Sequence, residues 1–548
     1  MNRSVTPFRL FFFFASVCCA CLPSVLSATE RAHLTVLSTT DLHGHIYPFD
    51  DYTQKPADVG LAKIATLIKQ ERERSPDLLL IDSGDVIQGT PLAYIHDSKN
   101  NGPIDPMMLV MNSLRYDCMA IGNHEYNFGL GVLEKARHEA RFPWLSANTY
   151  RTGTQENAFQ PYLIKTVAGV RVGILGLTTP GIPSWENPEN FAGLEFRETV
   201  SEARKWTSIL RDREKVDVVI VAMHMGLNYD PDSGKGDVGD IPDENAAITI
   251  AQQVPGIDLI LMGHTHRDVP AVVINGVLLA QAEKWGRKLI RADLYLSRGD
   301  SDERWAVTIK SSRSLSVSGV APDQEILSAT ARYQEEAQTW LDRVIGENAT
   351  AVSAQDGSLR DTALLDLVQR AQLDASGADV SLAANFNPAA RIPAGPVAVR
   401  DIASLYTYEN TLYVIEVTGA QLKEALEHSA RFFLPYEKGK SPRELVDPAI
   451  PGYNFDVAEG VSYDIDLRRP YGDRIQNLRF KNAPLVPDRR LKLAINNYRF
   501  NGGGGYTMFK DAPIISHSSE EIRDLIITWV EKHKTIPAEP SGNWRILP

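Results

Sequence analysis

The amino-acid sequence predicts an α/β protein with at least two domains. With 548 residues, the chain is longer than a single hydrophobic core usually supports. Between residues 34 and 262, short runs of Val, Ile and Leu alternate with stretches of helical periodicity. Uninterrupted apolar runs between helices are typical of strands that are covered on both faces. The first part of the chain is therefore predicted to be a layered sandwich of helices and sheet.

The expected elements of the first domain follow one another in a regular order. Apolar runs predict strands at residues 34–37, 78–81, 118–121, 170–177, 216–223 and 257–262. Helical spacing predicts helices at residues 60–72, 107–114 and 200–213. Residues 228–245 are predicted to be a solvated loop. This loop does not match a calcium-binding loop, because Lys235 and Ile241 stand where such a loop needs glycine and glutamate.

A connector and a second domain are expected after residue 320. Residues 323–345 have the spacing of an exposed helix, which we interpret as a linker and place at 321–346. Thr418 and the pair Ser518 and Ser519 are predicted helix starts. The domains would then span 29–320 and 347–548, the second of them an α+β domain. Its strands are predicted at 380–382, 412–417, 461–465, 475–480 and 491–495, and its helices at 420–432 and 519–532.

The first 28 residues have the features of a secretory signal peptide. Arg3 and Arg9 supply positive charge, residues 10–26 form an apolar run, and small residues lead up to Ala28. The alternative is a membrane anchor, but the run is short for a full span and a polar segment follows it. We therefore expect a periplasmic or secreted protein with no stable membrane insertion once the signal is removed.

Cysteine usage and net charge narrow the functional class. Cys18, Cys19 and Cys21 lie within the signal segment, and lipid attachment at one of them is an alternative to simple cleavage. Only Cys118 would remain in the mature chain, so no intramolecular disulfide is expected. Its apolar surroundings predict a buried, inert thiol. The net charge of −12 argues against a nucleic-acid polymer as partner, and we expect a monomer that binds a small molecule.

Polar side chains directly follow several of the predicted strands. Because ligands bind beyond the carboxyl ends of the strands in open α/β sheets, these side chains are expected to converge at one edge. Carboxylates, imidazoles and an amide suit Mn²⁺, Co²⁺, Zn²⁺, Fe or Mg²⁺, and without cysteine they do not form a structural zinc site. They are too numerous for one ion, so two divalent ions are expected. The candidates are Asp41, His43, Asp85, Asn123, His124, His224, His264 and His266.

In this order the motifs Asp-x-His, Gly-Asp, Gly-Asn-His-Glu, His and Gly-His-x-His resemble those of the calcineurin-like metallophosphoesterase family. The resemblance implies a four-layer α-β-β-α sandwich in which Asp85 bridges two metal ions. It also implies that His124 does not bind metal but faces the phosphate and protonates the leaving oxygen. By resemblance, one ion would be held by Asp41, His43, Asp85 and His266, and the other by Asp85, Asn123, His224 and His264.

The second domain extends the resemblance to the bacterial periplasmic 5′-nucleotidase superfamily. The segments 452–456 and 496–501, the second followed by four glycines, carry this resemblance. It implies that Tyr453 and Tyr498 stack the nucleotide base, that Arg391 helps to bind substrate, and that the domain rotates against the metal domain. Stacking of this kind contributes about 1–3 kcal/mol per base. The glycines would let the backbone turn tightly and approach a flat ligand.

Two branches of this superfamily fit the motifs. One comprises 5′-nucleotidases and UDP-sugar hydrolases, and the other comprises 2′,3′-cyclic-nucleotide 2′-phosphodiesterases with 3′-nucleotidase activity. His266, Asn127 and the segments 408–412 and 453–456 resemble the second branch, which is the predicted function. Asn127 is expected to orient His124 without the charge that an aspartate would add, so His124 would release its proton more readily.

Two other classes of function are weighed against this prediction. A metallophosphatase for non-nucleotide esters would not need the paired tyrosines and the glycine run. A nucleotide-binding or surface protein without turnover would be expected to have lost one or more of the metal-binding residues, and every motif position is present. The sequence therefore favours a hydrolase of nucleotide phosphate esters.

Overall fold

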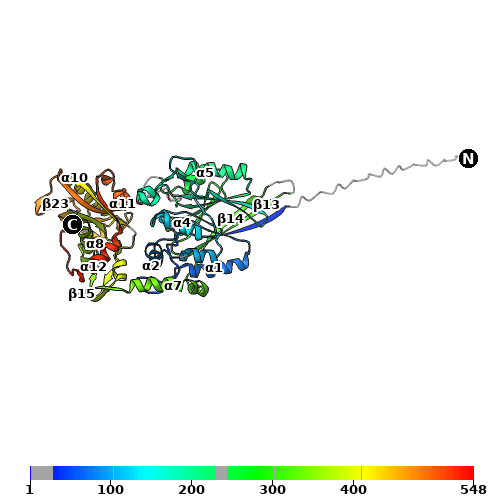
Figure 1. Cartoon of the computed structure of the whole chain (residues 1–548). Helices are drawn as coiled ribbons and strands as arrows, with labels where there is room; N and C mark the ends of the chain where they lie inside the picture. Colours follow the sequence, from blue (N-terminus) through cyan, green and yellow to red (C-terminus); the bar gives the residue numbers. More distant parts are fainter. Residues whose placement is uncertain (2–28, 103, 230–242, 300–303, 409, 548) are drawn as a thin grey trace.

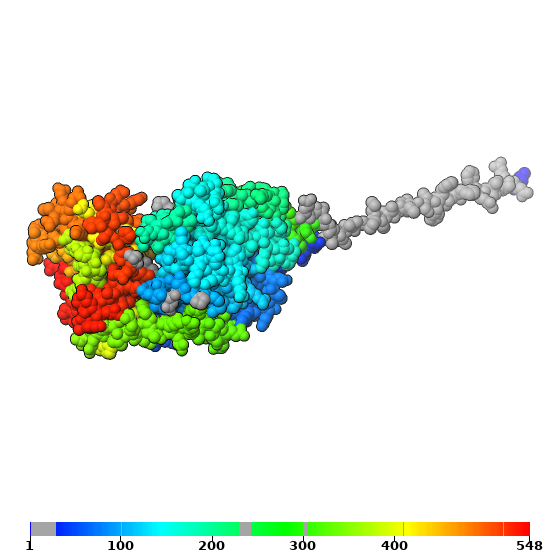
Figure 2. Space-filling model, viewed as in Figure 1, coloured from blue at the N-terminus to red at the C-terminus, as the bar shows by residue number. Residues whose placement is uncertain are grey.

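The computed structural model describes residues 1, 29–102, 104–229, 243–299, 304–408 and 410–547. Two domains lie side by side, and helix α7 (Gln324–Leu341) runs along the first domain towards the second (Figure 1 and Figure 2). Apart from Met1, the predicted signal segment and its three cysteines lie outside the described residues. Within the described ranges, no helix has the length and apolar composition needed to cross a bilayer.

The first domain contains two six-stranded sheets. In the first sheet the order is β14 (Ala306–Ser316), β13 (Lys288–Arg298), β1 (Glu30–Thr39), β2 (Leu79–Asp82), β3 (Cys118–Ala120) and β4 (Trp144–Leu145). In the second sheet the order is β11 (Val269–Ile274), β12 (Val277–Gln281), β10 (Leu259–Met262), β9 (Val218–His224), β7 (Val170–Thr178) and β6 (Tyr162–Val167). Strands β1 to β4 are parallel, as are β12, β10, β9 and β7, so their carboxyl ends share an edge in each sheet.

Apolar side chains fill three layers between helices and sheets. In β2, Leu79 and Ile81 pack between the two sheets, whereas Leu80 packs beneath the outer helices. Both faces of the strand are buried, which explains its uninterrupted apolar sequence. The four-layer α-β-β-α sandwich is therefore confirmed. Its outer helices are α1 (Leu61–Arg74), α2 (Pro91–Tyr94), α3 (Pro106–Ser113) and α4 (Gly129–Glu139) on the first sheet, and α5 (Thr199–Ser208) and α6 (Ala247–Gln253) on the second.

The second domain is built on a five-stranded and a four-stranded sheet around one apolar cluster. The five-stranded sheet has the order β21 (Asp456–Glu459), β17 (Val380–Ala384), β25 (Arg490–Asn496), β20 (Thr411–Thr418) and β26 (Ile514–Glu521). The four-stranded sheet has the order β24 (Ala483–Pro484), β23 (Ile475–Phe480), β22 (Val461–Asp466) and β27 (Trp544–Leu547). The helices are α8 (Ala363–Ser376), α9 (Val399–Ala403), α10 (Gly419–Ser429), α11 (Asn497–Phe500) and α12 (Ile522–His533).

The linker helix is shorter than predicted. Asp323 caps its start, because the carboxylate accepts hydrogen bonds from the backbone N–H groups of the first turn. The helix ends at Leu341, whereas the predicted helix continued to residue 345. Residues Val344–Asn348 form β15 instead, paired with β19 (Gly395–Ala398). Val344 and Ile345 are β-branched and favour a strand, whereas the predicted helix rested on periodicity alone.

One of the two predicted helix starts in the second domain is correct. The side chain of Thr418 accepts a hydrogen bond of 3.2 Å from the backbone N–H of Gln421 and so caps α10. The start predicted at Ser518 and Ser519 is wrong. These residues belong to β26, which pairs with β20, and α12 begins only at Ile522. Pairing along the sheet edge overrides the local capping preference of serine.

The domains contact each other on two sides of their shared boundary. Beside α7, Asp524 of the second domain accepts a hydrogen bond of 2.7 Å from Tyr94 Oη and pairs with Lys99 at 2.6 Å. On another side, Asn187 of the first domain donates to Thr411 Oγ1 at 3.0 Å. The second contact is close to the carboxyl ends of the parallel strands, where the predicted site residues lie.

Candidate active site

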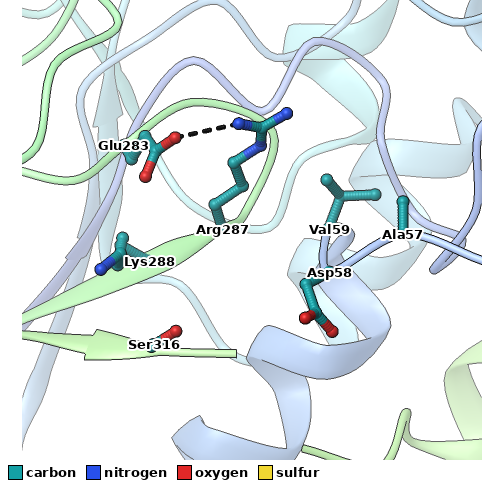
Figure 3. A pocket seen from close by; sticks show the side chains of 7 residues that line it. All are labelled: Ala57, Asp58, Val59, Glu283, Arg287, Lys288 and Ser316. Carbon is teal, nitrogen blue, oxygen red and sulfur yellow. Dashed lines mark hydrogen bonds and ion pairs between the residues drawn. The ribbon is translucent and has the colours of Figure 1, made fainter. Parts of the chain in front are cut away.

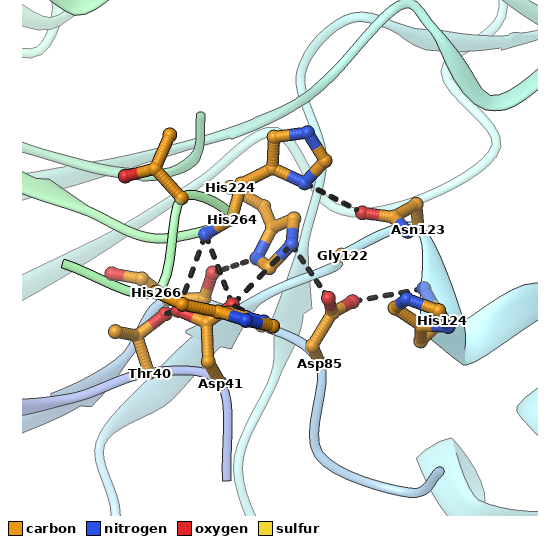
Figure 4. Close-up of polar contacts among 12 residues, drawn as sticks. Thr40, Asp41, Asp85, Gly122, Asn123, His124, His224, His264 and His266 are labelled. Carbon is orange, nitrogen blue, oxygen red and sulfur yellow. Dashed lines mark hydrogen bonds and ion pairs between the residues drawn. The ribbon is translucent and has the colours of Figure 1, made fainter. Parts of the chain in front are cut away.

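Seven side chains converge where the parallel strands end, and Figure 4 shows those of Asp41, Asp85, Asn123, His224, His264 and His266. We call them the candidate metal centre. Two subsets of the centre each have ligand atoms within 4.8 Å of one another, one being Asp41, His43 and His266 and the other Asp85, His224 and His264. The seventh member is Asn123, after β3. The structure thus brings together the residues that were named as metal ligands from the sequence, and it draws them from both sheets.

Asp85 belongs to the second subset and also faces the first. Its Oδ2 atom is 2.8 Å from Nε2 of His224 and 3.9 Å from Nε2 of His43. Its Oδ1 atom accepts a hydrogen bond of 2.8 Å from the backbone N–H of His124. Asn123 joins the second subset, since its Oδ1 atom is 3.0 Å from Nδ1 of His264. One carboxylate therefore faces both subsets, as a bridging ligand must.

The histidines of the centre each have one ring nitrogen turned inward. His43 donates through Nδ1 to the side chain of Gln88 at 3.1 Å, because the amide oxygen can only accept. His224 donates through Nδ1 to the carbonyl of Ser83 at 2.7 Å. In both rings Nε2 is then the atom that faces the centre. Metal-binding histidines are typically fixed in this way by an acceptor on the other nitrogen.

The end of the predicted solvated loop belongs to this site. Glu244 and Asn245 are each only 9% exposed. Oε1 of Glu244 accepts a hydrogen bond of 2.8 Å from Nε2 of His264. Nδ1 of the same ring then faces Asn123. The prediction of a solvated loop is therefore wrong at this end, because hydrogen bonds compensate the burial of polar groups. Residues 230–242 of the segment lie outside the described residues.

Burial and charge set the protonation of the centre. Burial lowers the pKa of His43 to about 3 and also lowers that of His266, which keeps both rings in the neutral form that binds metal. Burial opposes ionisation of Asp85, but His224 holds the pKa of this carboxyl well below its usual range. Burial also opposes a charge on His224, yet Asp85 and Asp41 raise its pKa to about 10. The two aspartates therefore stabilise a positive charge next to them, and a metal cation would supply such a charge.

Most members of the centre have a strained backbone. The φ angles are 50° for Asp41, 46° for His43, 60° for Asp85, 73° for His264 and 57° for His266. Residues other than glycine adopt this left-handed region uncommonly, and each such residue costs on the order of 1–3 kcal/mol. The concentration of strain at one place is typical of functional sites. Side-chain type alone did not indicate this feature.

Gly122 and Glu125, close to His124 in the sequence, lie against the loop that carries Asp85. A Cβ atom on Gly122 would lie 2.2 Å from Oδ1 of Asp85, so only glycine fits there. The carboxylate of Glu125 is fully buried and accepts backbone hydrogen bonds from Gly122 at 2.7 Å, Asp85 at 3.0 Å and Val86 at 2.6 Å. Sequence reasoning gave Glu125 no role, although its place within the Gly-Asn-His-Glu motif was a usable signal.

A buried carboxylate stands behind Asn127. Nδ1 of His124 donates to Oδ1 of Asn127 at 2.6 Å, and Nδ2 of Asn127 donates to Oε2 of Glu186 at 2.6 Å. Glu186 also accepts from the backbone N–H of Asn187 at 2.7 Å and the side chain of Asn190 at 2.9 Å. Burial raises the pKa of the Glu186 carboxyl group. The partners named above are all hydrogen-bond donors, and an ionised carboxylate can accept from all of them. Asn127 thus contacts the ring without a charge of its own, and it connects His124 with the carboxyl group of Glu186.

Tyr453 and Tyr498 lie on two short turns that one arginine joins. Tyr453 is 37% exposed in the turn η8 (Gly452–Asn454), and Tyr498 is half-buried in α11. The fully buried guanidinium of Arg499 lies 5.1 Å from the Tyr498 ring and donates to the carbonyl of Tyr453. It also pairs with Asp456 at 2.6 Å. Sequence reasoning missed Arg499, although it directly follows Tyr498 in the motif.

The glycine run lies against Tyr498, and Arg391 contacts Gln355. A Cβ atom on Gly503 would lie 2.5 Å from the Tyr498 ring, so the glycines do approach a flat ring, but this ring belongs to the protein itself. Arg391 is an exposed residue of strand β18 (Arg391–Ile392) and donates to Oε1 of Gln355 at 2.6 Å. This contact does not connect Arg391 with Tyr498.

Cys118 is buried, and burial raises the pKa of its thiol, in agreement with an inert residue.

The segment Trp185–Asn187 connects the candidate metal centre with the second domain. The ring of Trp185 is 5.4 Å from the ring of His264. The carbonyl of Trp185 accepts a hydrogen bond of 3.1 Å from Asn497, and the carbonyl of Glu186 accepts one of 3.3 Å from Asn501. These two asparagines flank Tyr498, and α11 lies on the side of the second domain that faces the first (Figure 1).

An open pocket of about 250 Å³ lies elsewhere on the first domain (Figure 3). Its charged side chains are already paired. Arg287 contacts Glu283 at 3.1 Å, and Asp58 contacts Lys63 at 2.6 Å. Pairing of this kind fits an ordinary solvated surface, and we assign no ligand to this pocket.

Comparison with known proteins identifies both domains. The model of the calcineurin-like phosphoesterase family matches residues 34–268, and the model of the 5′-nucleotidase C-terminal domain matches residues 344–511. The chain belongs to the 5′-nucleotidase superfamily. This phosphoesterase therefore combines a metal-dependent hydrolase domain with the C-terminal domain of nucleotidases, and it is a phosphoester hydrolase.

Individual relatives support action on nucleotides. The trifunctional nucleotide phosphoesterase YfkN of Bacillus subtilis is 29% identical over 95% of this chain, which spans 39% of that protein's length. The 2′,3′-cyclic-nucleotide 2′-phosphodiesterase/3′-nucleotidase of Yersinia enterocolitica is 28% identical over 96% of this chain and 90% of its own length. A Staphylococcus aureus protein assigned as a 5′-nucleotidase is 26% identical, with a TM-score of 0.83 over 94% of this chain and 100% of that chain. At these identities the relatives support a nucleotide phosphoesterase and do not distinguish the two branches.

Proposed function

We propose that this phosphoesterase uses two divalent metal ions to open 2′,3′-cyclic nucleotides at the 2′ ester bond and to remove phosphate from 3′-nucleotides. The observation that carries the two-metal proposal is the position of Asp85 between two subsets of ligand atoms, with His124 beside them. The choice of substrate is supported by Asn127 and His266 in the motifs and by the Yersinia relative.

The side chains of the candidate metal centre fit two divalent ions. The donor set is all oxygen and nitrogen, and acceptors outside the centre fix His43, His224 and His264 with one nitrogen inward. When bound, the two ions would neutralise charge on the phosphate and lower the pKa of an attacking water. Mn²⁺, Co²⁺, Zn²⁺, Fe and Mg²⁺ all suit part of this set. In this proposal one ion is held by Asp41, His43, Asp85 and His266, and the other by Asp85, Asn123, His224 and His264.

His124 is proposed to deliver the proton to the leaving ribose oxygen. Its Nδ1 atom is engaged with Asn127, so Nε2 is the atom that can reach a substrate. The ring is held by Asn127, and the carboxylate of Glu186 stabilises the positive charge that the ring carries before transfer. Asn127 and Glu186 are positioning residues, because they act on the substrate only through His124.

The second domain is proposed to hold the nucleoside. Tyr453 and Tyr498 would stack the base, with Arg499 fixing the distance between their two turns. Arg391 is proposed to assist substrate binding from the exposed edge. This arrangement separates the two tasks, since the first domain performs the chemistry and the second selects nucleotides.

A 5′-nucleotidase or UDP-sugar hydrolase is the second candidate function. It is favoured by the similarity to the Staphylococcus aureus structure, which covers both domains. For either function we propose a periplasmic or secreted monomer from which residues 1–28 have been removed, with a metal domain at 29–320, a linker at 321–346 and a nucleotide-binding domain at 347–548.

A substrate panel tests this proposal. We would measure kcat/KM for 2′,3′-cyclic AMP, 3′-AMP, 5′-AMP and UDP-glucose with Mn²⁺, Co²⁺ or Zn²⁺ added to metal-free enzyme. The proposal expects 2′,3′-cyclic AMP and 3′-AMP to be the preferred substrates with at least one metal. Preference for 5′-AMP or UDP-glucose with every metal would support the second candidate instead. Equal turnover in the presence of EDTA would contradict both.

A further inference from the structure

A second cluster of buried ionisable side chains lies away from the candidate metal centre. His96, Asp97 and Asp105, which we call the His96 cluster, have ligand atoms within 4.8 Å of one another. They are 4%, 5% and 1% exposed. His96 and Asp97 lie in η1 (Ile95–Asn100), a π-helical turn that follows α2, and Asp105 caps α3. Turns of this type are frequent at functional sites.

Each member of the His96 cluster has a buried polar atom that makes no hydrogen bond to the part of the chain that the structure describes. Nε2 of His96, Oδ2 of Asp97 and Oδ2 of Asp105 are all unpartnered. Nε2 of His96 lies 3.9 Å from Oδ1 of Asp97, which is too long for a hydrogen bond. A buried polar atom left in this way costs about 1–3 kcal/mol, and more when it is charged. Three such atoms close together indicate a missing partner.

Among the described residues, neighbouring side chains do not supply this partner. Lys135 is near enough to influence Asp97, but its ammonium is paired with Glu139 at 2.8 Å. The carboxylate of Glu139 in turn accepts hydrogen bonds from the backbone N–H groups of Ile104 at 3.0 Å and Asp105 at 2.6 Å. These groups therefore satisfy one another and leave the unpartnered atoms of the cluster facing inward.

The protonation states of these three side chains do not explain their unpartnered atoms. Burial raises the pKa of Asp97 well above its usual range and that of Asp105 to about 6, and it lowers the pKa of His96 to about 4. Burial thus favours the uncharged form of each group when no metal is bound. A neutral carboxyl group, however, still needs an acceptor for its proton, and no such hydrogen bond joins these side chains in the described part of the chain.

We propose that His96, Asp97 and Asp105 form a structural site for a divalent metal ion, separate from the candidate metal centre. One imidazole and two carboxylates are a donor set that suits Zn²⁺, Mn²⁺ or Co²⁺, with water or a carbonyl completing the coordination. Two ionised carboxylates balance the charge of a divalent ion. Binding releases whatever protons the two carboxyl groups carry.

The position of the His96 cluster gives the ion a structural task. It joins η1 to the start of α3, and the ring of Tyr333 on α7 packs 5.6 Å from the ring of His96. Lys99, at the other end of η1, pairs with Asp524 of the second domain at 2.6 Å. The ion would therefore hold the part of the first domain on which the linker helix and the second domain rest.

Metal counting on the whole enzyme tests this proposal. Wild type, Asp97→Asn and His96→Gln are dialysed against Zn²⁺ or Mn²⁺, freed of loose metal, and analysed for metal content per chain. We expect both variants to retain one metal ion fewer than wild type and to keep wild-type turnover of 3′-AMP. If Asp97→Asn does not fold, His96→Gln decides the question alone. Equal metal content in wild type and a folded variant overturns the proposal.

Asp366→Asn is the matched control. Asp366 in α8 is also fully buried, has an unpartnered Oδ1 atom, and has a pKa that burial raises to about 7, but no imidazole forms a metal group with it. This variant should keep the wild-type metal content. Melting curves add a second readout, because Zn²⁺ should raise the Tm of wild type more than that of His96→Gln. An equal rise in both overturns the proposal. Failure of the proposed nucleotide hydrolysis would instead appear as lost turnover with the metal difference intact.

Discussion

The candidate metal centre and the tyrosine turns of the second domain are built in different ways. The metal centre places ionisable groups at the ends of parallel strands or on the loops that follow them, and Asp41, Asp85 and His224 are fully or almost fully buried. Tyr453, by contrast, is 37% exposed and lies on a three-residue turn. The centre has many mutually dependent contacts, whereas Arg499 joins the two tyrosine turns.

This difference follows from what each site has to do. Metal ions and a reacting phosphate require distances fixed within fractions of an ångström, which rigid sheet edges and strained loops provide. A stacked base tolerates small displacements, because it is held by a broad apolar contact. We therefore expect substitutions in the metal centre to abolish activity on every substrate, and substitutions at the tyrosines to weaken activity by degrees and only on nucleotides.

The largest effect is expected for Asp85→Asn. Asp85 faces both subsets of the centre, so losing its charge should release both ions and lower kcat/KM at least about a thousandfold, since several kcal/mol of charge stabilisation is lost. Metal analysis and turnover of 3′-AMP and p-nitrophenyl phosphate check this, with circular dichroism to show that the variant folds. A folded variant that keeps both ions and full activity would remove Asp85 from its bridging role.

His124→Ala should lower kcat by about 10²–10⁴-fold while leaving the metal content unchanged, because His124 moves a proton and is not a ligand. The effect should be equal for nucleotides and for other esters with poor leaving groups. His138→Ala is the control, as His138 is exposed on α4 and should behave like wild type. Metal loss in His124→Ala would show that the ring supports the centre and not the leaving oxygen.

Tyr453→Ala should raise the KM for nucleotides by the equivalent of about 1–3 kcal/mol and leave p-nitrophenyl phosphate unaffected. Tyr453→Phe, which retains the ring, should stay close to wild type on both substrates. Steady-state kinetics with the three enzymes would separate stacking from a general disturbance of the domain. Parallel losses on both substrates would mean that this tyrosine does not act on the base.

The smallest effect is expected for Glu186→Gln, about tenfold in kcat, because the carboxylate acts on His124 only through Asn127. Without this charge, the protonated ring is less stable. The high-pH limb of the pH–rate profile, where a general acid loses its proton, should therefore move to lower pH. Glu189→Gln, an exposed neighbour, is the control. A profile that coincides with wild type would leave Glu186 with a purely structural role.

The metal centre could be predicted almost completely, because each of its residues directly follows an apolar run and belongs to a short motif. Glu186 could not be found in this way. It is 59 residues from Asn127 along the chain, and a hydrogen bond between two loops leaves no periodic pattern. Glu244 was hidden for a related reason, since a polar sequence signals exposure unless its partner, here His264, is known.

Among the elements, the predicted apolar runs form strands, but α4, α8, β13 and β14 were not predicted, and other errors lie at boundaries. Residues 344–348 and 514–521 form strands because they pair with distant segments, β19 and β20. Local helical spacing and serine capping preferences pointed the other way. Strand pairing across long separations depends on the assembled sheet, which local sequence describes only in part.

The segment Trp185–Asn187 has a thermodynamic consequence. Its backbone carbonyls accept hydrogen bonds from Asn497 and Asn501 of the second domain, and the side chain of Glu186 holds Asn127. Ordering of His124 and docking of the second domain are therefore linked equilibria. By reciprocity, whatever free energy the docked domain contributes to the orientation of His124, a correctly oriented His124 returns to docking. In the proposed function, nucleoside capture and proton delivery would therefore share one coupling free energy.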